Sequence, residues 1–508
     1  MMKNASILFD KHFVIGDVDS RLMGSFVEHL GRCLYNGVYE PSHPQADSLG
    51  FRNDVKMLIR EAGISGIRYP GGNFVSGYQW QDGVGPKAQR PVKKEMAWSM
   101  LETNEVGTNE FAAFTRDIGV DLIMACNLGT GSPMAAGELV DYCNTPSGTY
   151  WADLRRSHGV EQPYGISLWC LGNEMDGKWQ ISAMTAEEYA RKAREAAKII
   201  KWMDPQAQTI VCGSCTNEEG HLTFGEWDRV VLETCYDDID FISLHRYLNY
   251  RPNKLLVYAA HEDERDIPWL FSDLRCYLDT VIAACDFVKG RRKSNKDIAI
   301  SFDEWGVVTE SGAIPGGQQQ AYGYASFSQL DAVVYGGVLC TFLNYADRVK
   351  VACQSLLVNE GGMISTQPGG VAIRQATFYP FRDVARYAKG VSLRPVSNIE
   401  PCETAHHGQY VALESAATFD ALSGRLAVFI MNSDLTDDVA LQLQLNSFTR
   451  LKPISHTLLY TDDYRQVNSF EQPDNVVPIA LPLAEPVGGK LELVVKRHSW
   501  NVLIFETM

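Results

Sequence analysis

Long apolar runs are missing from this 508-residue sequence. No stretch reaches the roughly 18 uninterrupted apolar residues of a membrane span. The N-terminal segment MMKNASILFDKHF also lacks the apolar core that a signal peptide needs. We therefore expect a cytoplasmic protein with no membrane partner.

Positive charge is scarce. Lys and Arg total 46 against 62 Asp and Glu, which gives a formal net charge of -16 at pH 7. Such a chain repels phosphate backbones unless a local basic patch intervenes. The only dense basic run, KGRRKSNK at 289–296, is typical of a solvated loop. Nucleic acid is therefore not an expected partner.

Cysteine and glycine patterns that bind metals or nucleotides are also missing. The 12 cysteines are scattered singly through apolar segments, as reduced thiols of a core are. Cys212 and Cys215 form one close pair, but no second Cys or His pair supplies further ligands, so we interpret VCGSC as the end of a buried strand. Gly71-Gly72 lacks the spacing of a dinucleotide fingerprint. The sequence predicts no metal and no cofactor.

Short apolar runs alternate with segments of helical period over residues 16–385, and this alternation is typical of parallel β/α units. Eight candidate strands are present, the number of a (β/α)8 barrel. They span 23–30, 63–70, 120–128, 165–174, 209–215, 239–247, 297–305 and 336–345.

Alternating segments without helical period fill residues 386–508, and they predict an antiparallel β-sandwich. Leu441, Leu443 and Leu445, for example, share one face of a strand. Residues 1–15 are also strand-like, and we expect them to join this second domain.

The active site of such a barrel lies at the C-terminal ends of its strands. The predicted strand ends are rich in polar and aromatic groups: Glu28, His29, Arg68, the Gly71-Gly72-Asn73 turn, Asn127, Asn173, Glu174, Ser214, His245, Tyr247, Asp303, Glu304, Trp305, Asn344 and Tyr345. A purely structural barrel does not need this set.

Two of these residues, Glu174 and Glu304, follow the fourth and seventh strands and would face each other across the barrel. One carboxyl group can protonate a glycosidic oxygen while the other attacks the anomeric carbon. A separation of ~5 to 5.5 Å predicts retention, and a wider gap predicts inversion. Asn173 suits the sugar 2-hydroxyl, and Tyr247 is placed to hydrogen-bond Glu304 and keep it ionised.

Each of these side chains also has a structural interpretation. A glutamate at a strand end can cap a helix, His245 can be a core histidine, and Arg68 can form an ion pair with Glu28. Aromatic faces stack on sugars or pack in cores; we expect stacking for Trp98, Trp179 and Trp305, and a core position for Trp169.

These segments resemble the α-L-arabinofuranosidases of glycoside hydrolase family 51. The resemblance rests on GSFVEHLGRCLYNGVYEP, GIRYPGGNFVSGYQWQDGVGP, WCLGNEMDGKWQ, FISLHRY, FDEW and ADRVKVAC, which span the whole barrel. It implies cofactor-free, retaining release of terminal arabinofuranosyl residues from arabinan or arabinoxylan oligosaccharides. It further implies a cytoplasmic homo-oligomer, a hexamer.

The resemblance also implies roles for residues of this chain. Glu174 matches the acid/base and Glu304 the nucleophile. The expected substrate-binding residues are Glu28, Arg68, Asn73, Trp98, Asn173, Trp179, His245, Tyr247, Trp305 and Gln354. Leu356 stands where family members usually carry a glutamine, and Gln354, two residues earlier, is a candidate to replace it.

Other functions fit the same two glutamates. A β-xylosidase, a galactofuranosidase or an endo-glucanase would differ only in the shape of the pocket. A carbohydrate-binding barrel without turnover is expected to lack one of the two carboxylates, and both are present here. The sequence therefore predicts an α-L-arabinofuranosidase ahead of these alternatives.

Overall fold

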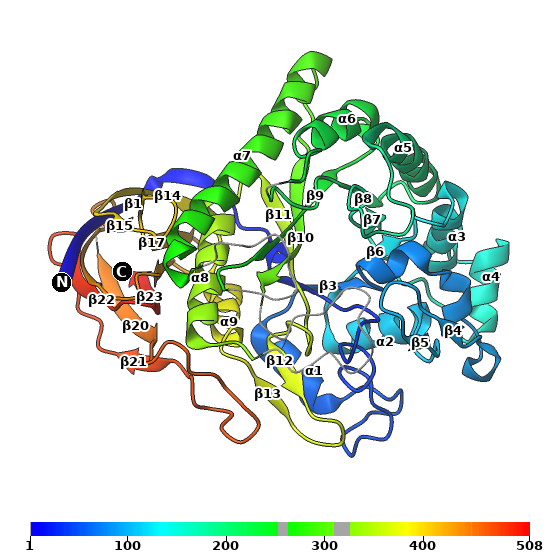
Figure 1. Ribbon diagram of the computed structural model, residues 1–508, viewed down its shortest axis with the longest axis horizontal. Coiled ribbons are helices and arrows are strands. Elements are labelled where there is room, and N and C mark those ends of the chain that lie inside the picture. Colours follow the sequence, from blue (N-terminus) through cyan, green and yellow to red (C-terminus); the bar gives the residue numbers. More distant parts are fainter. Residues whose placement is uncertain (1, 219, 252–262, 309–325, 449) are drawn as a thin grey trace.

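The computed structural model describes residues 2–218, 220–251, 263–308, 326–448 and 450–508. At its centre, eight parallel strands close into a barrel (Figure 1), as the sequence predicts. Around the barrel the order is β10 (Ala299–Val307), β11 (Val349–Gln354), β2 (Gly24–Phe26), β3 (Gly66–Tyr69), β6 (Asp121–Cys126), β7 (Leu168–Leu171), β8 (Gln208–Cys212) and β9 (Phe241–Leu248).

A helix follows each barrel strand and covers its outer surface. In α1, Val55, Leu58, Ile59 and Ala62 are buried at the spacing that places them on one face. The helices are α1 (Asn53–Ala62), α2 (Thr108–Ile118), α3 (Pro133–Asn144), α4 (Tyr150–Ser157), α5 (Ala186–Met203), α6 (Glu226–Cys235), α7 (Ile267–Arg292), α8 (Gln329–Asn344) and α9 (Phe378–Tyr387).

One predicted strand is wrong. The segment 336–345 lies in helix α8, and the eighth strand is β11. Helix α8 is buried on nearly every side between the barrel and the C-terminal sheet, so its sequence is apolar all round and shows no helical period. Asn344 and Tyr345 therefore end a helix instead of facing the barrel opening, and the Tyr345 hydroxyl bonds Asp279 at 2.8 Å.

The C-terminal region forms one curved, mostly antiparallel sheet of nine strands. Its order is β21 (Ile479–Leu481), β20 (Leu451–Leu459), β23 (Ser499–Thr507), β18 (Arg425–Asn432), β17 (Leu413–Asp420), β14 (Val391–Ile399), β1 (Met2–Asp17), β19 (Asp438–Gln444) and β22 (Lys490–Val495). The N-terminal strand β1 pairs antiparallel with β14 and parallel with β19, which brings the two ends of the chain into one sheet.

Alternation along β18 explains how this sheet attaches to the barrel. Leu426, Val428 and Ile430 point into the core inside the curved sheet, whereas the residues between them join the core of the barrel. The contact with α8 is close, because a Cβ at Gly336 would lie 2.3 Å from the ring of Trp500. The sheet therefore packs closely against α8.

Shorter elements lie outside the barrel and the nine-stranded sheet. They are the hairpins β4 (Lys93–Lys94) with β5 (Leu101–Glu102), β12 (Ile364–Thr366) with β13 (Ala372–Arg374), and β15 (Cys402–Glu403) with β16 (Gln409–Tyr410), and the 3-10 helices η1 (Ser20–Met23), η2 (Asn73–Gly77), η3 (Trp80–Gly83), η4 (Lys87–Gln89) and η5 (Glu264–Asp266).

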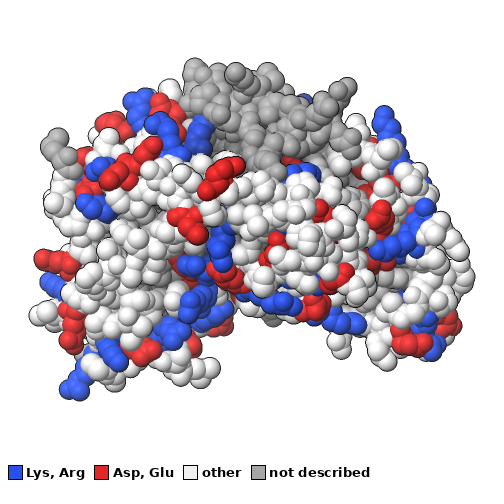
Figure 2. All heavy atoms as spheres, turned by 90° about the horizontal axis from the view of Figure 1, so that it is seen from below, with Lys and Arg blue, Asp and Glu red and all other residues white. Residues whose placement is uncertain are grey.

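Charged side chains of both signs are interspersed over the face shown in Figure 2. The basic run 289–296 is neutralised locally, since Lys289, Arg291 and Arg292 pair with acidic neighbours. All 12 cysteines lie in the described segments as free thiols. Of the helices that the structure describes, none combines the length and the apolarity needed to cross a membrane.

Candidate active site

Glu174 and Glu304 meet at the C-terminal end of the barrel. Glu174 lies three residues after β7, and Glu304 lies within β10, on the far side of the ring of strands. An oxygen of each carboxyl group and a nitrogen of His245 all lie within 4.8 Å of one another. This short separation fits retention, because inverting enzymes keep ~6.5 to 9.5 Å between their carboxyl groups to admit a water.

A left-handed turn places Glu174. Its φ is +45°, an uncommon conformation for a residue with a side chain, and Gly172 just before it has φ +92°. The backbone N–H of Gly177 donates to the Glu174 carbonyl at 2.8 Å and closes the turn. The carboxyl group of Glu174 therefore points back over the barrel axis toward β9 and β10.

Two donors hold the Glu174 carboxylate. Nδ1 of His245 lies 3.0 Å from Oε1, and the indole of Trp179 donates to Oε2 at 2.5 Å. Burial acts to raise the pKa of Glu174, but the hydrogen bond and charge of His245, together with the Trp179 indole, bring this pKa below its usual value. The free site thus favours an ionised Glu174 beside a protonated imidazole.

A β-bulge aims two consecutive acids into the barrel. The pairing of β10 with β9 shifts register between Ser301 and Glu304, and its pairing with β11 shifts between Phe302 and Trp305. Asp303 and Glu304 therefore both face inward, which regular alternation would forbid. Bulges of this kind often lie beside active sites and redirect a side chain.

The guanidinium of Arg68 is the main partner of Glu304. It donates to Glu304 Oε1 at 2.7 Å and to Asn173 Oδ1 at 2.6 Å, and its Nε lies 3.2 Å from Asp303 Oδ2. The alternative pairing of Arg68 with Glu28 is wrong, since its carboxylate partners are Asp303 and Glu304. Despite burial, the charges of Arg68 and His245 keep the pKa of Asp303 below its usual value.

Tyr247 completes the surroundings of Glu304. Its hydroxyl lies 2.8 Å from Glu304 Oε2 and 2.7 Å from the Ser355 hydroxyl. Burial and the charge of Glu304 raise the pKa of Tyr247 well above its usual value, so the phenol stays protonated and can donate. Together with Arg68, it leaves Glu304 with a donor on each oxygen.

His245 lies among three carboxylates and is not a histidine satisfied within an apolar core. Its Nδ1 is 3.7 Å from Glu304 Oε2, and its Nε2 is 3.6 Å from Asp303 Oδ1. Burial would lower the pKa of His245, but the charges of Glu304, Asp303 and Glu174 outweigh it and raise the pKa to about 10. A cation could also occupy the Glu174, His245 and Glu304 donors, but Arg68 already neutralises Glu304 there.

Glu28, two residues after the end of β2, is a further buried acid of the site. Its Oε1 accepts from the Phe74 backbone at 2.9 Å and from the Trp98 indole at 3.0 Å. Burial and the nearby charge of Glu304 raise the pKa of Glu28 to about 8. Gly72 lies between the two acids, and a Cβ there would come within 3.0 Å of Glu304 Oε1.

Amides form a chain below these acids. Asn173 donates to Asn73 Oδ1 at 3.3 Å, Gln180 donates to the same oxygen, and Ser76 donates to Gln180 at 2.8 Å. These hydrogen bonds fix the orientation of the Asn73 and Asn173 side chains next to Arg68. They link the turn after β3 to the loop after β7.

Two expected substrate-binding residues are not at the site. Trp305 is 1% exposed and packs outward on Tyr335 of α8, with ring centroids 5.0 Å apart, so it cannot stack on a sugar. Gln354 is fully buried, and its amide donates to Tyr335 at 3.1 Å and to the Gly361 carbonyl at 3.2 Å. It therefore does not replace the glutamine that Leu356 displaces. Trp98 and Trp179 do lie at the site, but both donate to carboxylates.

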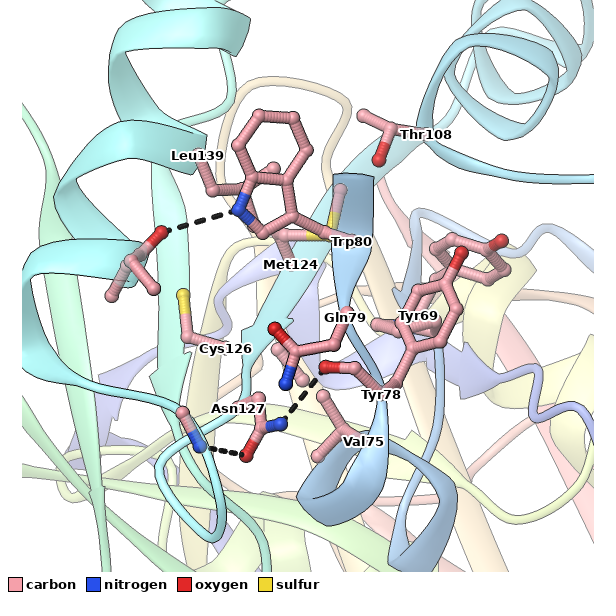
Figure 3. A pocket seen from close by; sticks show the side chains of 15 residues that line it. Tyr69, Val75, Tyr78, Gln79, Trp80, Thr108, Met124, Cys126, Asn127 and Leu139 are labelled. Carbon is pink, nitrogen blue, oxygen red and sulfur yellow. Dashed lines mark hydrogen bonds between the residues drawn. The ribbon is translucent and has the colours of Figure 1, made fainter. Parts of the chain in front are cut away.

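Other polar residues at strand ends have structural roles. Asn127 donates to the Tyr78 carbonyl at 2.8 Å and accepts from Gly131 at 3.0 Å, beside a small apolar pocket behind β3 and β6 (Figure 3). His29 bonds Glu102 at 2.6 Å, and Ser214 bonds Asp228 at 2.6 Å. These contacts stabilise loops around the site.

Two residues of the site, Gln180 and Ser355, were not singled out from the sequence, and Asp303 was named at a strand end without a predicted role. The FDEW motif contains Asp303, but only the bulge turns it inward, and no spacing rule marks Gln180 or Ser355. Taken together, the arrangement provides a carboxyl group between two donors, a second carboxyl group facing it, and buried hydrogen-bonding groups that suit a sugar ring.

Comparison with known proteins agrees with this chemistry. Residues 303–499 match the α-L-arabinofuranosidase C-terminal domain, and residues 58–264 match the α-L-arabinofuranosidase 1 domain. The chain is 42% identical over 507 residues to the intracellular exo-α-(1→5)-L-arabinofuranosidase 1 of Bacillus subtilis, covering 99% of each. It is 38% identical to an exo-α-(1→6)-L-arabinofuranosidase of Bifidobacterium longum, covering 99% of this chain and 97% of that one.

A solved structure gives the same result. A family 51 α-L-arabinofuranosidase from Bifidobacterium longum superposes with a TM-score of 0.92 at 36% identity, over 100% of both chains. Likeness at this identity and coverage includes both the barrel and the C-terminal sheet. The chain therefore belongs to glycoside hydrolase family 51, the retaining α-L-arabinofuranosidases.

Proposed function

We propose that Glu304 is the nucleophile and Glu174 the general acid/base of a double displacement that releases terminal α-L-arabinofuranosyl residues from arabinan or arabinoxylan oligosaccharides. An oxygen of Glu174 that lies within 4.8 Å of an oxygen of Glu304 supports this proposal most directly. Arg68 donates to one oxygen of Glu304 and Tyr247 to the other, and these donors support its role as the nucleophile.

In the first step, an oxygen of Glu304 attacks the anomeric carbon and forms a glycosyl ester while Glu174 protonates the leaving oxygen. In the second, Glu174 takes a proton from water, and the resulting hydroxide displaces Glu304. Glu174 and His245 share the required proton, because Oε1 of Glu174 and Nδ1 of His245 lie 3.0 Å apart. Because His245 carries it in the free site, substrate binding must shift it to Glu174 before the bond breaks.

The furanose ring would lie among Glu28, Arg68, Asn73, Asn173 and Tyr247. All five present buried or partly buried polar groups around the two acids. A site built of such groups rejects a sugar that leaves them unpaired, at ~1 to 3 kcal/mol for each lost contact. We therefore propose discrimination by the pattern of ring hydroxyls.

The cellular location and the oligomeric state can also be proposed. We propose that the enzyme acts on oligosaccharides inside the cell, and the word intracellular in the name of the Bacillus subtilis relative supports this location. We also propose a homo-hexamer of two-domain chains, with residues 16–385 as the barrel and 386–508 plus 1–15 as the sheet domain. Light scattering during gel filtration tests the assembly against six times 56.6 kDa.

The relatives differ in the linkage that their names give, (1→5) in one and (1→6) in the other. Initial rates on matched (1→5)- and (1→6)-linked arabinobiosides, beside aryl β-xylosides and β-galactofuranosides, test the substrate. We expect arabinofuranosides to be preferred, and a preference for another sugar would contradict the substrate while leaving the mechanism.

The role of Glu174 is tested by Glu174→Ala. The variant should hydrolyse 4-nitrophenyl α-L-arabinofuranoside far better than an arabinobioside, because a good leaving group needs no proton. It should also lose the alkaline limb of the pH profile. Equal losses on both substrates would contradict the assignment of Glu174.

A further inference from the structure

Three metal-ligating side chains meet beside the active site, outside the residues used above. Asp176 lies in the loop after β7, Cys215 lies three residues beyond the end of β8, and His221 precedes α6. One donor atom from each, an oxygen, a sulfur and a nitrogen, lies within 4.8 Å of the others. Because the three come from separate segments, their spacing in the sequence does not predict the cluster.

The contacts within the cluster leave one atom unused. Nε2 of His221 lies 2.7 Å from Asp176 Oδ2, and the backbone N–H of Cys215 donates to the same oxygen at 3.0 Å. The Asp176 side chain is 0% exposed, yet its Oδ1 has no hydrogen-bond partner among the described residues. A buried carboxylate oxygen without a donor is costly, and such an exception needs a physical explanation, a missing ion among them.

We propose that Asp176, Cys215 and His221 bind a divalent transition-metal ion of the Zn²⁺ class. Thiolate, imidazole and carboxylate are the three ligand types that Zn²⁺ takes in proteins, and three protein ligands leave a fourth position for water. A harder ion such as Mg²⁺ or Ca²⁺ would prefer an all-oxygen set. The donor chemistry therefore selects the ion.

The donor atoms, all within 4.8 Å of one another, need to move by at most about 1 Å relative to each other to hold the ion. Tetrahedral bonds of ~2.0 to 2.3 Å place donor atoms roughly 3.3 to 3.8 Å apart. The contact of His221 with Asp176 must therefore open by about half an ångström, and Asp176 Oδ1 offers a second oxygen if Oδ2 keeps its bond to Cys215. Metal binding replaces the thiol proton of Cys215 and the Nε2 proton that His221 shares with Asp176, and both protons go to solvent.

A simple ion pair between His221 and Asp176 explains less. It accounts for Oδ2 but not for the unpaired Oδ1, nor for the Cys215 sulfur within 4.8 Å of the Asp176 and His221 donor atoms. A bound ion would use all three. It would also fasten the loop that carries Glu174 and Trp179 to the segment between β8 and α6.

Titration of the metal-free, full-length protein with Co²⁺ tests the proposal, because a cobalt thiolate gives a near-ultraviolet charge-transfer band. We expect a band that saturates at one equivalent, disappears when Zn²⁺ is added, and accompanies a rise in the melting temperature. Cys215→Ser should abolish the band, and His221→Ala should weaken binding at least ~10-fold. His221 is a partly exposed loop residue, so its variant tests the site even if Cys215→Ser folds poorly.

Cys276→Ser is the matched control, because Cys276 is an exposed free thiol outside the cluster, and this variant should keep the band. Glu304→Gln should also keep it, which separates the site from the Glu174, His245 and Glu304 donors. The absence of a charge-transfer band in the wild type would overturn the proposal, as would a band that persists unchanged in Cys215→Ser and His221→Ala.

Discussion

The indole nitrogen of Trp179 lies 2.5 Å from Oε2 of Glu174. A second indole, that of Trp98, makes the same kind of contact with Glu28 at 3.0 Å. The pKa of Glu174 nevertheless lies below its usual value, whereas that of Glu28 is raised to about 8. The difference follows from their neighbours, because Glu174 has the positive charge of His245 and Glu28 has the negative charge of Glu304.

Trp179→Phe removes the donor from Glu174 and keeps an aromatic ring. Losing a hydrogen bond to the carboxylate raises the pKa of Glu174, so the alkaline limb of kcat/KM should move to higher pH. Trp98→Phe is the control, since it removes the equivalent donor from Glu28 and should leave that limb in place. An unmoved limb in Trp179→Phe would show that the indole does not set the proton affinity of Glu174.

Tyr247→Phe removes one of the two donors on Glu304. A hydrogen bond to a charged group contributes ~1.5 to 3 kcal/mol, so kcat/KM should fall roughly 10- to 100-fold if the bond is realised in the transition state. Ser355→Ala removes only the neighbour of the Tyr247 hydroxyl and should cost less. Equal effects of the two variants, measured on an aryl arabinofuranoside, would contradict a direct role for the phenol.

Glu28→Gln tests the raised pKa through stability. The folded protein holds the Glu28 proton up to a pKa of about 8, against 4.5 for an ordinary glutamate, so this stabilisation is present below pH 4.5 and is lost as pH rises toward 8. The loss is at most about 1.4 kcal/mol per pH unit over that window. Glutamine cannot ionise, so the variant should lose less stability between pH 5 and 8, as measured by urea unfolding.

A parallel pH dependence in wild type and Glu28→Gln would mean that Glu28 is already ionised in the folded protein. Glu360→Gln is a useful comparison, because burial raises the pKa of Glu360 to about 7 at a position outside the proposed furanose site. That variant should change the pH dependence of stability without changing the KM for arabinofuranosides.

Strand ends can be predicted from the sequence because polar residues interrupt apolar runs there. Glu28, Arg68, Asn173, His245 and Glu304 all lie at the end of the barrel where this logic places them. The residues that contact each other across the site are less predictable. Arg68 reaches Glu304 and not Glu28 because of where β3 and β10 stand in the closed barrel, which no local pattern contains.

Burial on both sides and the bulge in β10 explain the misassigned features. Helix α8 is apolar all round because it lies between two cores, so its segment imitates a buried strand. Trp305 follows two inward-facing acids because of the bulge, and it therefore points outward to α8. Gln354 lies at the end of β11, but inside the fold its amide donates to the Tyr335 hydroxyl and to the Gly361 carbonyl.

The covalent intermediate gives the most direct test of the central claim. An activated 2-fluoro arabinofuranoside slows the second step, so the glycosyl ester accumulates, and peptide mapping by mass spectrometry locates it. We expect one arabinofuranosyl adduct on Glu304 in the wild type and none in Glu304→Gln, whose kcat should fall at least ~10⁴-fold. An adduct on any other residue, or rapid turnover by Glu304→Gln, would contradict the assignment of Glu304 as the nucleophile.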